Sequence, residues 1–503
     1  MTKALLAIAM LCPVAAGFAA MLDVSSTNDV GAGSLRDLIH SAVPGDTIYF
    51  SVMGTIILTN GALVITNDLS IIGPGATDMA ISGNGSSRIF QIGSNVSVSI
   101  SDIFLRDGRA PSGTINSRNG ADGGGVYNSG ALSLTGCTLS GNVAGGGASG
   151  LDCPTIGCFA GGGGAGGNGG AIYNEGALSV NACTFSDNSA GSGGSGGNGY
   201  VAGFGGDGGK GGAIYNASQL TSFSSTLSRN SGGAGARGGF GFTLAAGGRG
   251  GDGGAIYNTS VLTLTACTIS GNSGGLSGSD ASGSRSNTGG SGGGVNNTGS
   301  ANLRSVLIAL NRIWSGSSFG CPAGPDLAGA FNSRGHNLIG QIDGGGGLSN
   351  GVNADIAGVS TEPLDPKLGP LQNNGGSTFT MALLLGSPAF DHGDDALLNP
   401  PLTLTTDQRG LMRRSCVHVD IGAYELQAPV LNSPGKNGND ITITFTTEVG
   451  RNYRLEGIDC LGANSWMIVT DNIPGTGRTA EAFDIGGGSR RKRFYRVAML
   501  PGN

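Results

Sequence analysis

Carboxylates are the side chains of this sequence that could catalyse the widest range of reactions, because two of them can act together as general acid and base or as nucleophile. Six of those in the glycine-rich middle of the chain are Asp152, Glu175, Asp187, Asp207, Asp252 and Asp280. A catalytic set needs carboxylates presented together on one face. These six stand at different positions relative to the repeated motifs around them, and mostly within predicted loops. The spacing therefore predicts no catalytic pair.

Metal and thiol chemistry also finds few candidates. The chain has four histidines, so a zinc site built on Cys153 and Cys158 would need ligands that the neighbouring sequence does not offer. These two cysteines, in Leu-Asp-Cys-Pro-Thr-Ile-Gly-Cys, are instead the best candidates for a disulfide. A calcium ladder of the Gly-Gly-x-Gly-x-Asp kind is not predicted, since Gly166-Gly167-Asn168-Gly169-Gly170 is followed by Ala171 and not by aspartate. We predict no catalytic, cofactor-binding or metal-binding residue.

Composition and charge exclude several classes of protein. The 503 residues include 100 glycines, but no Gly-x-y period runs through the chain, which argues against collagen. Only 12% of residues are charged and the net charge is −6, so no basic stripe is available to bind nucleic acid. The one dense basic run, residues 490 to 493, is predicted to be a solvated strand edge or turn.

The amino terminus predicts export. Lys3 precedes an apolar stretch from Ala4 to Leu11, and small residues follow through Ala20, which is the pattern of a secretory signal peptide covering residues 1–20. No later segment reaches 18 apolar residues, so we expect no transmembrane helix and an extracellular or surface location.

Five repeated modules dominate the middle of the chain. Their opening motifs, of the type Gly-Gly-Ala-Ile-Tyr-Asn, begin 39 to 46 residues apart and lie at 123–128, 169–174, 211–216, 253–258 and 292–297. Within each module a second asparagine follows the first by 14 residues: Asn142, Asn188, Asn230, Asn272 and Asn311. A constant interior with variable connections is typical of stacked coils that carry surface insertions.

Apolar residues within a module alternate in short runs, as in Leu132 and Leu134, which predicts two or three short strands per coil. Parallel stacking places like residues on like, so a ladder of small inward residues is expected at Cys137, Cys183 and Cys267. The second asparagines should lie at a corner, where asparagine tolerates the left-handed conformation and bonds neighbouring backbone. The tyrosines at 127, 173, 215 and 257 are interpreted as a structural stripe, and the glycine-rich inserts as long loops protruding from one corner.

The Gly-Gly-Ala-Ile motif with its later Phe/Leu/Ile-x-x-Asn resembles the repeats of polymorphic outer-membrane proteins and autotransporter passengers, which implies a right-handed parallel β-helix of the pectin-lyase-like class on a bacterial cell surface. The chain departs from autotransporters after residue 311, because no alternating-strand barrel follows. Residues 315–427 resemble the choice-of-anchor Q region, through Gly-His-Asn-Leu-Ile-Gly, Gly-Ser-Pro-Ala-Phe-Asp and Asp-Gln-Arg-Gly. This resemblance implies structural hydrogen bonds and ion pairs, rather than chemistry, for His392, Asp394, Asp395, Asp407, Arg409 and His418.

The sequence thus predicts an all-β chain: a right-handed parallel β-helix (solenoid) with glycine-rich loops and a small C-terminal antiparallel β-sandwich. The expected units are a signal peptide (1–20), an N-terminal cap and first coils (21–120), glycine-rich coils (121–314), the choice-of-anchor Q-like end of the β-helix (315–427) and the β-sandwich (428–503). A short helix is expected near Ser34, where the cap covers the apolar end of the first coil.

Two functions remain open. The first is a non-enzymatic exported surface protein, adhesive or architectural, whose partner is a surface polysaccharide or a host or neighbouring cell surface. The second is a carbohydrate-active β-helix enzyme, a polysaccharide lyase or glycoside hydrolase, with an unrecognised active site. The absence of a visible carboxylate constellation favours the first.

Overall fold

The computed structural model describes residues 19–284, 288–314, 324–448, 450–460 and 465–500. The predicted signal peptide lies outside the described residues except for Ala19 and Ala20. No helix within the described ranges has the length and apolar character needed to span a bilayer.

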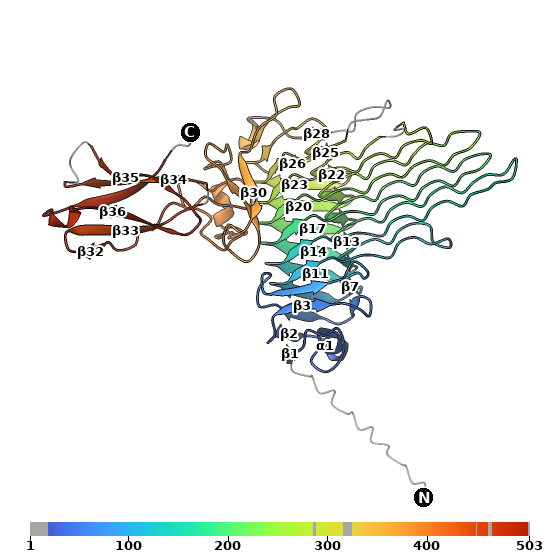
Figure 1. Ribbon diagram of the computed structural model, residues 1–503, viewed down its shortest axis with the longest axis horizontal. Helices are drawn as coiled ribbons and strands as arrows, with labels where there is room; N and C mark the ends of the chain where they lie inside the picture. The colour runs from blue at the N-terminus through green and yellow to red at the C-terminus, as the bar shows by residue number, and fades with distance from the viewer. Residues whose placement is uncertain (1–18, 285–287, 315–323, 449, 461–464, 501–503) are drawn as a thin grey trace, which may run out of the picture.

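The predicted right-handed parallel β-helix is confirmed (Figure 1). Its coils contribute strands to three parallel sheets. Sheet 1 contains β1 (Met21–Val24), β2 (Asp46–Phe50), β5 (Leu69–Ile72), β8 (Ser97–Ser101), β11 (Ala131–Thr135), β14 (Ala177–Asn181), β17 (Gln219–Phe223), β20 (Val261–Thr265), β23 (Ser300–Arg304) and β26 (Asn332–Ser333).

Sheet 2 contains β4 (Leu63–Ile65), β7 (Phe90–Ile92), β10 (Val126–Asn128), β13 (Ile172–Asn174), β16 (Ile214–Asn216), β19 (Ile256–Asn258), β22 (Val295–Asn297), β25 (Leu327–Ala330) and β28 (Gly345–Gly346). Sheet 3 contains β3 (Gly54–Ile57), β6 (Met79–Ser82), β9 (Phe104–Arg106), β12 (Thr138–Ser140), β15 (Thr184–Ser186), β18 (Thr226–Ser228), β21 (Thr268–Ser270), β24 (Leu307–Ala309), β27 (Leu338–Ile339) and β29 (Ile356–Ala357).

The repeats stack in register, so that equivalent side chains form ladders inside the helix. Leu132 pairs with Leu178, which pairs with Leu220 on the next coil. All three are buried in one core that runs the length of the β-helix. Cys137, Cys183 and Cys267 are fully buried in that core, which confirms the predicted small inward position.

The corner asparagines are buried and form a continuous ladder, as predicted. The side-chain oxygen of Asn188 accepts from the backbone N–H of Asn142 at 3.0 Å, and Asn230 repeats the contact with Asn188 at 3.1 Å. The left-handed conformation, however, belongs to the preceding residue and not to the asparagine: φ is positive at Asp187 and Arg229. The asparagine supplies hydrogen bonds to the stacked corner, and its neighbour makes the turn.

A short helix covers the first coil. Helix α1 (Leu35–Ser41) begins after Ser34, whose side chain accepts from the backbone N–H of Asp37. Leu35 and Ile39 face the apolar end of the β-helix and belong to its core. The helix therefore caps the stack at the position the sequence predicts.

The chain after residue 364 does not extend the stack but returns along sheet 3. This segment contains β30 (Leu368–Gln372), β31 (Thr380–Leu383) and the short turn η2 (Asp395–Leu398), and it follows η1 (Val352–Ala354). Gln408 bridges two coils: its amide nitrogen donates to the Thr184 hydroxyl at 2.9 Å, and its oxygen accepts from the Thr226 hydroxyl at 2.6 Å. The segment is thereby fixed across the outer face of sheet 3.

The predicted C-terminal β-sandwich is confirmed. One sheet holds β32 (Gly435–Asn437), β33 (Asp440–Thr446) and β36 (Thr479–Asp484), and the other holds β34 (Asn452–Ile458), β35 (Met467–Pro474) and β37 (Phe494–Met499), with η3 (Gly487–Ser489) before the last strand. The sandwich extends from the opposite side of the β-helix to the glycine-rich inserts (Figure 1). In the basic run, Arg490 and Arg493 pair with Asp459 at 2.6 and 3.0 Å.

Candidate functional site

The glycine-rich inserts leave the β-helix between sheets 3 and 2 and project to one side as stacked arms, as predicted (Figure 1). We call them the fin, and define it as residues 109–122, 143–168, 189–210, 231–252, 273–284 and 288–291. Each long insert has an arm that leads outward and an arm that returns. The fin is the most distinctive surface of the molecule, and its order was not expected from the sequence.

Backbone hydrogen bonds tie every arm to its neighbours at intervals of three residues. On the returning arm, the N–H groups of Gly203, Gly206 and Gly209 donate to the outgoing arm of the same insert at 2.8 to 2.9 Å. The N–H groups of Gly205 and Gly208 donate to Ala246 and Arg249 of the next insert. Three residues per turn is the period of a polyproline II helix. The fin is therefore a two-layer bundle of such helices, one layer outgoing and one returning.

The close approach of the arms explains the glycine content. A Cβ atom on Gly206 would collide with the carbonyl oxygen of Gly164 in the preceding insert, and one on Gly209 would collide with that of Gly167. Two positions of each three thus have little room for a side chain and are mostly glycine, with alanine at 148, 236 and 245, and only the third position faces solvent. The inserts therefore do carry a period of three, which corrects the expectation that no such period exists. The bundle differs from collagen because its arms run in both directions within one chain.

The third positions form two faces, one on each layer. Ser192, Ser195 and Asn198 lie on the outgoing face, and Asp207 lies on the returning face. Their acidic and amide side chains bond to the next insert: Asp152 accepts from the N–H of Asn198 at 2.7 Å, and Asp207 accepts from that of Arg249 at 2.6 Å. These carboxylates act as acceptors for backbone N–H groups of the next insert.

The arms end in a cluster of apolar side chains, which we call the apolar tip: Leu151, Ile156, Phe159, Tyr200, Phe204, Phe240, Phe242 and Leu244. Three successive inserts contribute to it, and each of the eight side chains is exposed. The rings of Tyr200 and Phe242 stack with centroids 5.5 Å apart. Cys153 and Cys158 form the predicted disulfide at this end of the fin.

A tyrosine stack lies at the root of the fin on sheet 2. The rings of Tyr127, Tyr173, Tyr215 and Tyr257 stack at centroid distances of 5.2, 5.0 and 5.3 Å. Burial and a hydrogen bond to Glu175 raise the pKa of Tyr127 to about 12. The Arg88 guanidinium lies over the Tyr127 ring, 5.2 Å from its centroid, and the Lys210 ammonium lies 4.4 Å from the centroid of Tyr257. The rings thus stack mainly on one another, which agrees with the predicted structural stripe.

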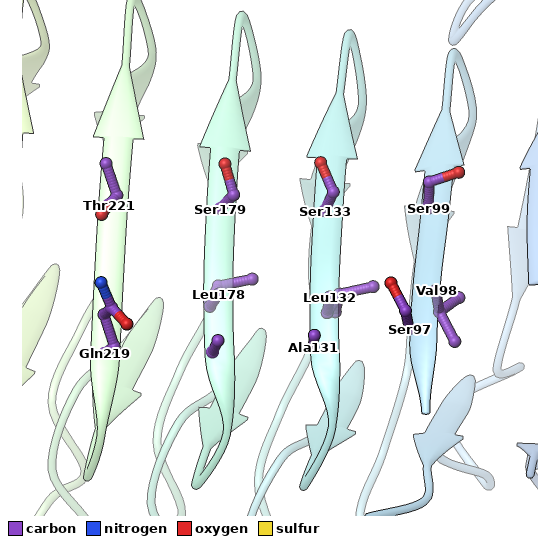
Figure 2. Close-up of a pocket in the computed structure, with 11 residues that line it drawn as sticks. Ser97, Val98, Ser99, Ala131, Leu132, Ser133, Leu178, Ser179, Gln219 and Thr221 are labelled. Atoms are coloured by element: carbon purple, nitrogen blue, oxygen red, sulfur yellow. The ribbon is translucent and has the colours of Figure 1, made fainter. Parts of the chain in front are cut away.

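The outer face of sheet 1 forms a shallow groove across four strands, β8, β11, β14 and β17 (Figure 2). Hydroxyl groups of Ser99, Ser133, Ser179 and Thr221 stand in one row along it (Figure 2). The other lining residues include Ser97, Ala131 and Gln219, and none of those that line the groove is ionisable. The groove can donate and accept hydrogen bonds, but it has no group that could transfer a proton near neutral pH.

The ionisable residues of the returning segment lie together but are inaccessible or paired. Asp407 pairs with Arg409 at 2.9 Å with both side chains buried, and Asp394 pairs with Arg304 at 2.6 Å. The sandwich residue Glu448 also contacts Arg409, at 3.3 Å, so this network joins the sandwich to the β-helix. His418 bonds to Asp395 at 2.9 Å. The predicted structural role of these residues is confirmed.

Two buried carboxyl groups lie within this segment. Burial raises the pKa of Asp420 to about 7 and that of Glu425 to about 9, and the negative charge of Asp420 adds to the rise in the pKa of Glu425. Glu425 accepts from the backbone N–H of Asp420 at 2.8 Å, and both residues are fully buried. A polymer substrate cannot reach this pair, although its pKa values alone would suit acid catalysis.

Comparisons with known proteins do not assign this chain to a family. No protein-family model and no curated protein matches this chain. Within the described part of the chain, no three His, Cys, Asp or Glu side chains gather in a geometry that could hold a metal ion.

Proposed function

We propose that this protein is a non-enzymatic exported surface protein whose β-helix carries the fin away from the body and presents the apolar tip. The observation that carries the proposal is the contrast between the two ends of the inserts: a lattice of backbone hydrogen bonds near the body, and eight exposed apolar side chains at the tip. An ordered support ending in an apolar cluster suits adhesion. A surface polysaccharide or a neighbouring cell surface is the proposed kind of partner.

The state of the acidic residues also supports a non-enzymatic role. Asp152 and Asp207 accept from backbone N–H groups, and Asp420 and Glu425 are inaccessible. The groove on sheet 1, which would be the natural place for a polymer, has no ionisable lining residue. Surface attachment through the choice-of-anchor Q-like segment 315–427 and export by the leader 1–20 belong to the same proposal.

Two assays test this function. Purified chain starting at Met21 is incubated with a panel of uronates and of plant and algal polysaccharides, and no product release is expected. Reproducible release that a single carboxylate substitution abolishes would instead establish the enzyme alternative. In parallel, cells that display the chain are compared with cells that display a variant whose three long inserts are shortened by whole triplets. Adhesion should fall in the variant, and equal adhesion would refute display by the fin.

A further inference from the structure

The apolar tip exposes more apolar surface than a free soluble protein normally does. Ile156 is 93% exposed, Phe242 82% and Phe159 77%. A fully exposed aromatic side chain has roughly 150–250 Å² of surface. The five aromatic residues of the tip are 44 to 82% exposed, so together with the three aliphatic ones they exceed the few hundred square ångströms that a typical apolar patch reaches. Three inserts of different sequence supply this surface at the same end of the fin. The tip is thus a surface that another phase or molecule covers.

The tip is apolar on both faces and at its apex. Phe204 lies three residues before Asp207 on the returning layer, and Phe240 lies three residues after Arg237 on the outgoing layer. Their side chains therefore point to opposite faces of the bundle, with Phe159 and Phe242 beyond them. A flat, rigid partner can touch only one of these sides. A soft apolar phase can surround all of them.

Charge and backbone bonding at the tip also fit an apolar medium. No charged residue occurs within 153–160, 199–204 or 238–246. Several backbone groups there are paired between neighbouring inserts: the N–H of Cys153 donates to Asn198 at 2.7 Å, that of Ala160 to Val201 at 2.9 Å and that of Phe242 to Tyr200 at 3.1 Å. Burying unpaired backbone groups or charges in a lipid phase is costly, so their pairing or absence lowers the cost of insertion.

Protein interfaces have a different composition. They carry about one hydrogen bond per 100–200 Å², mostly from a polar rim. The side chains of the tip offer few partners for such bonds, chiefly the hydroxyl groups of Thr155, Tyr200 and Thr243. The outgoing arm from Ala144 to Cys153 spans ten residues, or roughly 30 Å at polyproline II rise, so the tip can reach a surface without contact by the body.

We infer that the apolar tip docks on a lipid surface by inserting its aromatic and aliphatic side chains among the acyl chains. The inference rests on the proposed function, since it assumes that the fin is a display structure, and it names the partner as a lipid phase. Because the tip has no basic cluster, docking is hydrophobic and does not need anionic lipid.

Flotation with neutral phosphatidylcholine vesicles tests the inference. The chain starting at Met21 is used, so that the apolar leader cannot contribute. We expect the protein to float with the vesicles at both low and high salt. The variant Phe159→Ser, Phe204→Ser, Phe242→Ser should bind at least about 100-fold more weakly. A matched control, Val417→Ser with Ile485→Ser, removes exposed apolar side chains elsewhere and should bind normally. Equal thermal unfolding of the three proteins establishes that they are folded.

A fluorescence measurement locates the contact with the vesicle. Tryptophan in the Phe242→Trp variant should shift to the blue with vesicles, whereas that in Ile485→Trp should not. Failure of the unmodified protein to float, or flotation that the triple variant does not reduce, overturns the inference. A concentration-dependent dimer that the triple variant abolishes, without flotation, would assign the tip to a second copy of the chain. Fin-dependent cell adhesion without vesicle binding would refute lipid docking while leaving the proposed function intact.

Discussion

The coils of the β-helix body and the inserts of the fin stack along the same axis, but the two regions exclude water by opposite means. In the body, large side chains such as Leu134 and Phe185 fill the interior between the sheets. In the fin, the arms approach so closely that two positions of every three are mostly glycine and none of them holds a residue larger than alanine between stacked inserts such as 189–210 and 231–252. The body is therefore stabilised chiefly by apolar burial, and the fin by backbone hydrogen bonds. Tolerance to substitution should differ accordingly.

The largest expected effect is in the body. Leu134 is fully buried on β11, and Leu134→Asp would place an unpaired carboxylate in the core. We expect destabilisation of about 4 kcal/mol or more, measured as the shift in denaturant midpoint. Ser133→Asp, on the outward face of the same strand, is the control and should change stability by less than about 0.5 kcal/mol. Equal effects of the two variants would remove Leu134 from the core.

The asparagine ladder of the body ends on an acid, which makes this ladder sensitive to pH. Asp326 accepts from the backbone N–H of Asn311 at 3.0 Å, as an asparagine does on the other coils. Burial raises its pKa to about 6 from 3.8. The folded state therefore binds a proton between about pH 4 and pH 6 that the unfolded chain has released, and its contribution is present below pH 4 and lost as the pH rises through 6.

The change that isolates the titration of this group is Asp326→Asn, which keeps the oxygen that accepts from Asn311 and loses the one that accepts from the N–H of Gln341 at 2.8 Å. Loss of that bond shifts stability equally at every pH, so the pH dependence of the difference reports the titration. Relative to the unmodified protein, the variant should gain on the order of 3 kcal/mol in unfolding free energy between pH 4 and pH 7. Unfolding of both proteins at each pH measures the difference, and other titrating groups cancel in it. A difference that does not vary with pH would show that Asp326 titrates normally.

The sequence predicts the body far better than the fin. The 14-residue asparagine spacing and the alternation of apolar residues, as at Leu132 and Leu134, predict stacked coils. Side chains that point inward must be apolar or small, so they leave a recognisable pattern in the sequence. The turn residues Ala182 and Ser224 adopt positive φ without a residue type that signals it. The return of residues 364–427 to sheet 3 depends on outward hydroxyls, such as that of Thr226, which resemble solvent-facing groups in the sequence.

The order of the fin was missed for a related physical reason. Its bonds join backbone groups, as when Gly208 donates to Arg249 in the next insert, and backbone groups carry no residue-type signal. A period of three confined to short inserts is also hidden when periodicity is sought along the whole chain. The exposed phenylalanines of the tip are separated by up to 83 residues, from Phe159 to Phe242, so only the stacked arms bring them together. The unequal positions of the six carboxylates named above, such as Asp152 and Asp207, predict no catalytic set, and this stays a prediction.

Within the fin, steric room should matter more than side-chain chemistry. A Cβ on Gly194 would meet the carbonyl oxygen of Ala148, so Gly194→Val should separate the two arms and destabilise the bundle locally by about 2 kcal/mol. Hydrogen exchange of the amides in residues 189–210 should accelerate, with little change in the unfolding of the β-helix. Ser195→Val, one residue along on the exposed face, should leave exchange unaltered. Similar exchange in the two variants would contradict close packing of the arms.

The smallest expected effect on stability distinguishes a hydrogen bond that is exposed to water from an equivalent hydrogen bond in the core. Asp207 accepts from the N–H of Arg249 at 2.6 Å on an exposed face, whereas Asn230 makes the equivalent bond to Asn188 while fully buried. Water can replace the acceptor at Arg249, so Asp207→Ala should cost less than about 0.5 kcal/mol of unfolding free energy. Only the Arg249 amide should exchange faster, because Gly248 and Gly251 donate to backbone carbonyls that the substitution leaves in place. Faster exchange at all three amides would mean that side chains on the faces hold the arms together, and the contrast between fin and body would then fail.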